Sequence, residues 1–498
     1  MAKKILVATL YESGAIYHAA NLESAMQHWE HGHEVTFLNC RARNYFCEYN
    51  PKGNRMQCYV CKMQNRRGLK AFPSNVNHIF LDELLSTDDL KVIDSLSEEA
   101  IDKGIAEDTT YEEFDWGRGI LSTMISRTRD NKLNLNEYPI ETSNIARSSM
   151  GAYFALSNLF KNKRFDKVYL HNGRHAMLRA ILRACEKFEI PYGTTEGGQD
   201  LRHYGVFENA MPHSISPKIA EINRLWNNAT DEREAIGASF YKRKIVGNST
   251  TAGTIQDYTG EQTSGMLPED WDPKKHNVVI FNSSEDEYAS IGDEWSLQFY
   301  DDQLDGINRI GQSLSKCDEH LRIYLRVHPN LKDVTNEFTR GISKLTNSKI
   351  IVIPAESKIS SYELMFRCNT VLSFGSTIGI EAVYWNKPSI LLGQSFYRLL
   401  GGTYTPDSHS QLMDLLCVPL KPKNRLPALI YGYYLMTFGK EYKHTIIRKT
   451  RQDITFRGVH LNGNWLIRSL LSIRRKLGGS SNPRAQRRAQ KKAKKKLK

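Results

Sequence analysis

The chain has 498 residues, of which 40% are hydrophobic and 25% charged, and its 68 Lys and Arg against 55 Asp and Glu give a formal net charge of +13. Typical domains have ~150 residues, so this length excludes a single small module and predicts at least two domains. The composition lies in the globular range, which excludes a wholly disordered or collagen-like chain.

The first half of the chain has the pattern of alternating strands and helices. A helix with apolar residues at helical spacing is expected over Ala15–His31. Short β-branched, apolar runs predict strands at Lys4–Leu10, Glu34–Cys40, Lys167–Asn172 and Ile190–Glu196. The insert Leu85–Asn144 lacks strand alternation and is expected to form helices that cover the sheet.

The second half repeats this pattern. A helix is expected over Trp295–Leu314, which contains an acidic pair, Asp301 and Asp302, interpreted as solvated. Strands are predicted within Asn277–Ser284, Leu321–Pro329, Lys349–Glu356, Thr370–Thr377 and Pro388–Gly393. The fold class is therefore α/β, with two Rossmann-like domains.

The predicted boundaries follow composition. Residues 1–247 form the N-terminal Rossmann-like domain with its helical insert, and the Gly, Ser and Thr-rich segment 248–275 is the linker. Residues 276–420 form the second Rossmann-like domain, and 421–473 form C-terminal helices. The last segment, 474–498, has twelve Lys and Arg and no acidic residue, so it is expected to be a disordered basic tail behind a nearly neutral body.

This basic tail suits an anionic membrane surface, where each Lys or Arg contributes about 1 kcal/mol. Nucleic acid is an unlikely partner because the tail has no aromatic residues for base stacking. A solvated tail without a partner is the third alternative. No apolar run reaches the ~18–20 residues that span a bilayer, and the N-terminus MAKKILVATL lacks a signal-peptide pattern. We therefore expect a cytoplasmic protein, peripheral at the inner face of the cell membrane.

The run LSFGSTIGIEAVYWNKPSILL contains the strongest motif, a strand followed by the turn Gly375, Ser376 and Thr377 and then a helix. Backbone N–H groups and hydroxyls at such a junction favour phosphate. Glu381, one turn into the helix, is suited to accept hydrogen bonds from two ribose hydroxyls. The alternative is that the hydroxyls only cap the helix and that Glu381 is solvated.

Two further turns end neighbouring strands. In RVHPN, Pro329 stops the strand and holds His328 at the carboxyl edge of the sheet, where open α/β sheets bind ligands. A histidinium there would neutralise a phosphate and protonate the leaving nucleotide, and Arg326 would add a second cation. The turn FNSSEDE contributes three polar residues to the same crevice: Asn282, Ser283 and Ser284.

In the first half, the predicted acceptor-side residues are Gly14, Asn172 and Arg174. Glu196 ends a strand and is the candidate base that removes the acceptor proton; alternatively it forms a buried pair with Arg174 or Arg202. No DxD-type carboxylate pair stands where a divalent ion would bind, so metal-independent chemistry is expected.

Eight cysteines in a cytoplasmic chain are expected to be reduced. Four of them are closely spaced, and the second pair has zinc-ligand spacing: Cys40, Cys47, Cys58 and Cys61. The sequence therefore predicts a structural zinc, with reduced core thiols or an iron–sulfur cluster as the alternatives.

Read together, NSSEDE, RVHPN and FGSTIGIEAVYWNKPSILLG, with LHNGRHAMLRAILRACEKFEIPYGTTEGG in the first half, resemble the capsule and surface-polysaccharide glycosyltransferases. That resemblance implies two facing Rossmann-like domains of the GT-B type. Bacterial sialyltransferases and Kdo transferases, which use CMP-sugars, have similar His-Pro and Ser/Thr elements that contact the donor phosphate. Carried over, those contacts fall on His328, Ser376 and Thr377. The first half lacks their Asp-Asp-Gly or Glu-Asp-Gly element, so UDP- and GDP-sugars remain alternatives to a CMP-sugar.

The function expected from these residues is transfer of a sugar from a nucleotide donor to a saccharide or lipid-linked glycan, without a catalytic cofactor. A CDP-glycerol-type polyol-phosphate transferase and a UDP-sugar epimerase are the alternative enzymes. A non-catalytic nucleotide or glycan binder is the alternative of another class.

Overall fold

The computed structural model describes residues 2–10, 15–41, 47, 50, 53–73, 76–247, 262–314, 320–345, 349–448 and 453–463. The chain forms two compact units. Unit 1 contains Met1–Thr128, Leu133–Pro212 and the described residues from Gly439 onward. Unit 2 contains the short segment Arg129–Lys132 and the long segment His213–Phe438.

This division differs from the one expected from composition. Two helices expected to belong to the N-terminal domain, α7 (Ile215–Asn227) and α8 (Arg233–Ile245), group instead with unit 2. The reason is packing, since α8 lies against α14 (Leu426–Thr437) so closely that a Cβ on Gly237 would be 2.3 Å from the Leu429 carbonyl oxygen. The expected linker is described only from residue 262, and the basic tail lies outside the described residues.

Unit 1 is built on a seven-stranded sheet in the order β12-β6-β5-β4-β1-β2-β3. The strands from β5 to β3 are parallel, and β6 and β12 are antiparallel additions at one edge. Their bounds are Lys4–Thr9 (β1), Glu34–Asn39 (β2), Asn77–Phe80 (β3), Lys167–His171 (β4), Tyr192–Gly197 (β5), His203–Glu208 (β6) and Lys440–Glu441 (β12). The 3-2-1-4-5 order of the parallel strands is that of a Rossmann fold.

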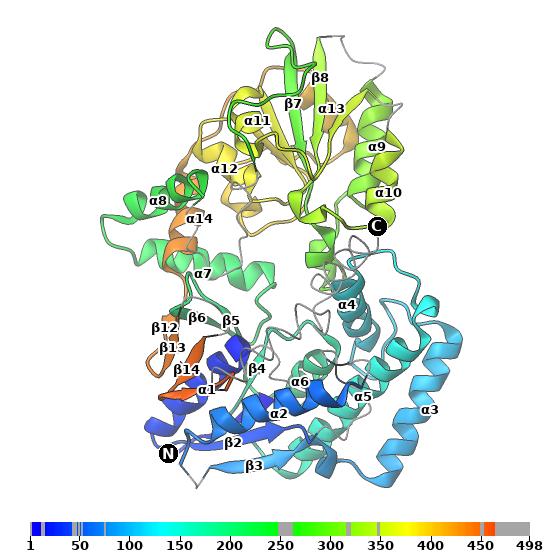
Figure 1. Cartoon of the computed structure of the whole chain (residues 1–498), viewed down its shortest axis with the longest axis vertical. Helices are drawn as coiled ribbons and strands as arrows, with labels where there is room; N and C mark the ends of the chain where they lie inside the picture. The colour runs from blue at the N-terminus through cyan, green and yellow to red at the C-terminus, as the bar shows by residue number, and fades with distance from the viewer. Residues whose placement is uncertain are drawn as a thin grey trace, which may run out of the picture. The chain divides into compact units, whose positions relative to one another are not determined.

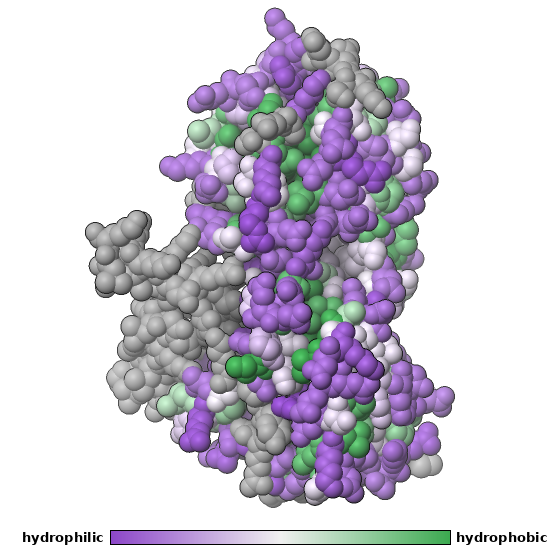
Figure 2. Space-filling view, turned by 90° about the vertical axis from the view of Figure 1, so that its right-hand side faces the viewer, coloured by the Kyte–Doolittle hydropathy of each residue, from purple (hydrophilic) through white to green (hydrophobic). Residues whose placement is uncertain are grey.

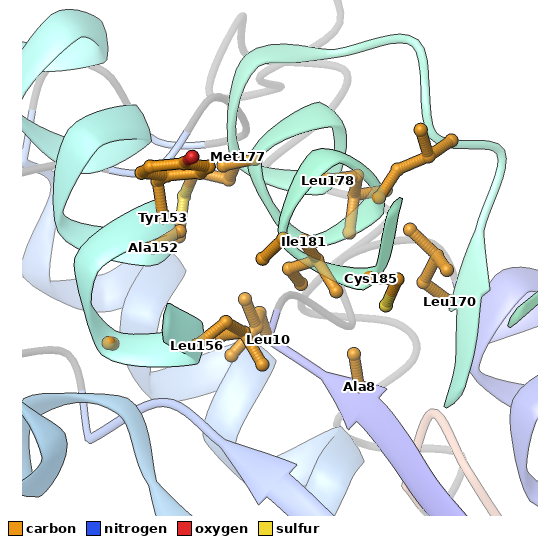
Figure 3. Close-up of a cluster of buried hydrophobic side chains, with 14 of the residues drawn as sticks. Ala8, Leu10, Ala152, Tyr153, Leu156, Leu170, Met177, Leu178, Ile181 and Cys185 are labelled. Atoms are coloured by element: carbon orange, nitrogen blue, oxygen red, sulfur yellow. The ribbon is translucent and has the colours of Figure 1, made fainter. Parts of the chain in front are cut away.

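Helices cover the two faces of this sheet. One face packs against α3 (Thr87–Lys103), α4 (Trp116–Thr128), α5 (Pro139–Asn162) and α6 (Ala176–Lys187). Figure 3 shows part of this core, where Ala8 and Leu10 meet side chains of α5 and α6 such as Leu156 and Ile181. The opposite face packs against α1 (Ala15–Glu30), with α2 (Arg55–Leu69) beside it.

The C-terminal part of the described chain returns to unit 1 as a small antiparallel sheet of β13 (Thr445–Ile447), β14 (Ile454–Phe456) and β15 (Val459–His460). It packs on α1, whose Glu23 has 0% exposure. The Glu23 carboxylate accepts hydrogen bonds from the Lys443 and His444 backbone N–H groups and from the Thr445 hydroxyl. Helices alone were expected over 421–473, so these strands differ from the prediction; aromatic and basic content did not reveal their short alternation.

Unit 2 has a five-stranded parallel sheet in the order β11-β10-β7-β8-β9. The strands are β7 (His276–Phe281), β8 (Leu321–Arg326), β9 (Ile350–Ile353), β10 (Thr370–Ser373) and β11 (Ser389–Leu391). This is again the 3-2-1-4-5 order in chain sequence. The strands expected in this half are all present, with shorter bounds.

The two faces of this second sheet are also covered (Figure 1). On one face lie α9 (Gln303–Ser313), α10 (Glu337–Ser343) and α13 (His409–Leu416), and on the other lie α11 (Ser361–Arg367) and α12 (Ile378–Tyr384). The helix expected from Trp295 begins only at Gln303, because the Asp302 side chain caps it by accepting the Asp305 N–H. Asp302 is therefore a buried cap and not a solvated helix residue.

The α/β class and the two parallel sheets confirm the fold expected from the sequence. None of the helices in the described ranges is long and apolar enough to span a membrane. The face in Figure 2 is mostly hydrophilic, with hydrophobic residues in small groups.

Candidate functional site

The three polar turns of the second half follow β7, β8 and β10, which are neighbours in the sheet of unit 2. Because parallel strands end at the same edge, the three turns lie at one edge of the sheet. The side-chain amide oxygen of Asn282, after β7, accepts the backbone N–H of His328, after β8, at 2.9 Å. The structure therefore brings these two predicted residues together and ties their turns to each other.

Ser283 lies beside the third turn. Its backbone N–H donates to Gln303 Oε1 at 2.8 Å, which fixes the turn, but among the described residues its own hydroxyl has no hydrogen-bond partner, although Ser283 is only 7% exposed. A Cβ placed on Gly375 would be 3.6 Å from this hydroxyl. Buried hydroxyls are normally hydrogen-bonded, so this hydroxyl keeps the capacity to donate to a further polar atom.

Gly375 is required by its backbone. Its φ of +128° lies in the region that L side chains rarely adopt, and a Cβ there would be 2.7 Å from the Gln394 carbonyl oxygen. Next to it, the Ser376 carbonyl accepts the Tyr397 hydroxyl at 2.6 Å. The Tyr397 side chain thus fixes the turn, and the lack of a side chain on Gly375 allows the Gln394 carbonyl to approach the turn closely.

Thr377, which directly precedes α12, and Glu381 on α12 form a cluster with two residues that the sequence did not point to. Lys244 Nζ, from α8, donates to Thr377 Oγ1 at 3.0 Å and to Glu381 Oε1 at 2.6 Å, and Thr377 Oγ1 donates to the same carboxylate oxygen at 2.9 Å. The Tyr362 hydroxyl, from α11, donates to Glu381 Oε2. Glu381 is 2% exposed, so it is a buried, paired carboxylate and not a solvated one.

His328 is held neutral. Burial and, to a smaller extent, the charges of Lys244, Arg129 and Arg326 together lower the pKa of its imidazole to about 4, against an opposing effect of Asp286. Its Nδ1 accepts the Asn330 backbone N–H at 3.1 Å, so the proton of the neutral ring is on Nε2. The expected histidinium is therefore replaced by a neutral hydrogen-bond donor in a positively charged surrounding.

Two predicted donor contacts have structural partners instead. The Ser284 hydroxyl donates to Asp286 at 2.6 Å and accepts from Arg129, which itself forms a buried ion pair with Asp286 at 2.9 Å. The Arg326 guanidinium donates to the carbonyls of Pro354 and Ser357, after β9, and burial lowers its pKa to about 10.

In unit 1, β4 and β5 are neighbours, and their ends bring together two predicted residues. The Asn172 side-chain amide donates to Glu196 Oε2 at 2.7 Å, and the Gly197 backbone N–H donates to Oε1 at 3.0 Å. Both partners of the carboxylate are neutral, so the expected alternative of an ion pair with Arg174 or Arg202 is not what the structure describes. Beside them, His171 stacks on Tyr17 with ring centroids 3.9 Å apart.

Arg174 does not join Glu196. Its guanidinium donates to the Ser122 and Ser126 hydroxyls on α4, at 3.0 and 2.9 Å, and so fixes the start of α6 to its neighbour. Gly14 lies outside the described residues.

Of the four clustered cysteines, two precede α2 in the chain and two belong to it. Cys58 and Cys61 are on the helix, and Cys58 Sγ accepts the Asn50 side-chain amide at 3.0 Å. Cys40, Cys47 and Cys61 pack at the edge of the hydrophobic core of unit 1. In the described ranges no three His, Cys, Asp or Glu side chains gather as a metal-binding group. The structural zinc stays a prediction.

Lys244 and Arg129 are the residues that sequence reasoning missed. Lys244 is the last residue of the run KRK, which from sequence alone is typical of a solvated, basic helix end. Arg129 belongs to a four-residue segment of unit 2 that is separated from the rest of that unit by Leu133–Pro212. No local pattern marks either one. The role of each basic residue depends on the carboxylate that it pairs with. Glu381 and Asp286 are both distant in sequence from Lys244 and Arg129.

No family model and no curated protein matches the sequence. The chain is similar to solved structures of the α/β class. Among them are a KpsC β-Kdo 2,4 transferase of Thermosulfurimonas dismutans, 13% identical over 54% of this chain and 79% of that one, with a TM-score of 0.33. The spinosyn rhamnosyltransferase SpnG is 10% identical over 87% and 95% of the two chains, with a TM-score of 0.25. A UDP-GlcNAc 2-epimerase of Neisseria meningitidis bound to UDP-GlcNAc is 14% identical over 94% and 100%, with a TM-score of 0.24. These values are too low to transfer a residue role or a reaction to this chain.

Proposed function

We propose that the protein is a glycosyltransferase that moves a sugar from a nucleotide-sugar donor to a saccharide or lipid-linked glycan in surface-polysaccharide biosynthesis. The observation that carries the proposal is the carboxyl edge of the unit 2 sheet. There a neutral His328, an unpartnered Ser283 hydroxyl and a glycine turn are neighbours, in a surrounding that three cations make positive.

This set suits a phosphate. The Ser283 hydroxyl and the His328 Nε2–H group are hydrogen-bond donors. Hydrogen bonds to an anionic oxygen are stronger than hydrogen bonds between neutral groups. When the bond between the anomeric carbon and the phosphate oxygen breaks, the electron pair stays on the phosphate. Stabilising that charge where it develops lowers the barrier.

The acceptor side of the proposal rests on Glu196. Its oxygens are oriented by the Asn172 amide and the Gly197 N–H, and among the described residues no cation pairs with it, so the carboxylate is placed to accept a proton from a hydroxyl. In this role Glu196 accepts the acceptor proton while the acceptor oxygen forms the new bond to the anomeric carbon.

The test is a turnover assay of purified protein against CMP-, UDP- and GDP-sugars, with and without glycan acceptors. Nucleotide release that requires an acceptor supports the proposal. Conversion of UDP-GlcNAc without an acceptor would indicate an epimerase, transfer from CDP-glycerol a polyol-phosphate transferase, and nucleotide binding without turnover a non-catalytic binder. His328→Gln should reduce nucleotide release, whereas the matched change His31→Gln, at an exposed site in unit 1, should not.

The other predicted properties belong to the same proposal. Catalysis is proposed to need no divalent ion, so added EDTA should leave turnover unchanged. The basic tail is proposed to bring the enzyme to an anionic membrane surface on the cytoplasmic side. Removal of residues 474–498 should then abolish sedimentation with vesicles that contain phosphatidylglycerol without changing turnover of soluble acceptors.

A further inference from the structure

Two cations of the unit 2 cluster still have hydrogen-bonding capacity among the described residues: Arg326, whose Nε is buried without a partner, and Lys244. Of these two, Lys244 contacts the Gly375 turn, through Thr377. An ammonium group has three N–H donors. Two of them are used, by Thr377 Oγ1 at 3.0 Å and Glu381 Oε1 at 2.6 Å. In the described part of the chain no acceptor is found for the third donor, although the side chain is only 12% exposed.

The buried ion pair of Arg129 and Asp286 provides the contrast. The Arg129 guanidinium donates to both Asp286 oxygens, to Ser284 Oγ and to the Asn330 carbonyl, all at 3.2 Å or less. The charges of Arg129 and Asp286 thus neutralise each other, and protein groups accept the hydrogen bonds of the guanidinium, as expected of a structural ion pair. Lys244 has fewer partners, and one of them, Thr377, belongs to the same turn as Gly375.

From these contacts we infer that Lys244 is the cation that binds the phosphate of the donor nucleotide, and that Glu381 and Tyr362 position its ammonium group. This inference rests on the proposed function and adds to it a residue and a role. Thr377 Oγ1 and Glu381 Oε1 hold the ammonium at the Gly375 turn, where its third N–H is the donor left for a phosphate oxygen.

Glu381 then has a different task from the ribose contact expected from sequence. Its Oε1 accepts from Lys244 and Thr377, and its Oε2 accepts from Tyr362. A carboxylate so engaged is a positioning residue for the ammonium, not an open acceptor for two ribose hydroxyls. The nearby His328 supports the geometry, since Lys244 is the charge that depresses the pKa of its imidazole most.

The test compares CMP with cytidine, because the pair differs only in the phosphate. Isothermal titration should show that Lys244→Gln weakens CMP about 10- to 100-fold and leaves cytidine within twofold, the size expected for a hydrogen bond to a charged group. Lys242→Gln is the matched control, because Lys242 lies two residues before Lys244 on α8 and is exposed. This variant should change the affinity for neither CMP nor cytidine. UDP and uridine serve in the same way if the protein prefers uridine nucleotides.

Lys244→Gln leaves Glu381 buried without its cation, which threatens folding. The double variant Lys244→Gln/Glu381→Gln removes both charges and should fold, with the same loss of CMP affinity as the single variant. In either variant, histidine NMR should show the pKa of His328 moving up from its depressed value towards the ordinary one. The other charged groups facing His328 are Arg129, Arg326 and Asp286, and these stay in place.

If wild-type protein binds CMP or UDP and the double variant binds it equally well, the role of Lys244 is wrong while the proposed function stands. If wild-type protein binds none of these nucleotides, the proposed function fails and the inference with it. A wild-type preference for CMP over 2′,3′-dideoxy-CMP that Glu381→Gln abolishes would return Glu381 to the ribose and overturn its positioning role.

Discussion

The carboxyl edges of the two parallel sheets differ in charge although the sheets share one strand order. In unit 2, Lys244, Arg129 and Arg326 surround a neutral His328. In unit 1, Glu196 is held by neutral donors, and Arg174, the cation nearest in sequence to Asn172, donates to two serine hydroxyls instead. The same topology thus carries a cluster of cations around a neutral histidine in one unit and a carboxylate held by neutral donors in the other.

Among variants at the two edges, we expect the largest effect on turnover at Glu196. Glu196→Gln keeps the size and the Asn172 contact but removes the base, so turnover should fall about 10²- to 10⁴-fold while nucleotide affinity stays unchanged. Glu208→Gln, on the neighbouring strand β6 and exposed, is the control and should keep turnover. Steady-state kinetics with calorimetric nucleotide binding measure both, and loss of binding in Glu196→Gln would place that residue on the donor side.

Gly375 tests the unit 2 edge. Gly375→Ala adds a Cβ to a left-handed turn against the Gln394 carbonyl, so it should cost about 1–3 kcal/mol of stability and weaken nucleotide binding at least tenfold. Gly401 also has a positive φ, +83°, but nothing lies within 4 Å of its Cβ position. Gly401→Ala should therefore reduce stability without changing nucleotide binding. Thermal unfolding measures the stability of both variants, and titration measures their nucleotide affinity. Equal binding by both variants would exclude the Gly375 turn from the site.

The neutral state of His328 predicts a pH dependence. Because its folded pKa of about 4 lies below the ordinary value of 6.5, the unfolded chain takes up a proton first as the pH falls. The contribution of His328 to the free energy of unfolding is fully present above pH 6.5 and is lost between pH 6.5 and 4. Wild type minus His328→Gln in denaturant unfolding should show a loss on the order of 1–3 kcal/mol across that window. A difference independent of pH would mean that His328 is not held neutral.

Two adjacent serines give the smallest and most local test. Ser283→Ala removes a hydroxyl without a partner, so stability should change by less than about 0.5 kcal/mol while nucleotide affinity falls about 3- to 10-fold. Ser284→Ala breaks the contacts to Asp286 and Arg129 and should instead cost about 1–3 kcal/mol of stability. The reverse pattern would assign the ligand to Ser284.

Sequence periodicity was sufficient for β1, β2, β4 and β5 of unit 1 and for the five strands of the unit 2 sheet, because buried parallel strands are continuous apolar runs bounded by turns. It also located the three turns of unit 2, since glycine, proline and hydroxyl residues mark strand ends locally. It missed β3, β6 and the strands after Gly439, which are short or partly exposed. It also gave no sign that Lys244 meets Glu381 or that Arg129 meets Asp286, because those contacts join segments more than 130 residues apart.

The return of the chain to unit 1 after Gly439 sets an order of completion during synthesis. The residues of unit 2 leave the ribosome before the segment that covers α1, and translation at roughly 5–20 residues per second makes the delay on the order of ten to fifty seconds. Through that interval Glu23 has none of the donors that Lys443, His444 and Thr445 later supply, and the apolar face of α1 is uncovered. The unit that is synthesised first is therefore finished last, and a nascent chain arrested before β13 presents an incomplete unit 1 to the chaperones and proteases of the cell.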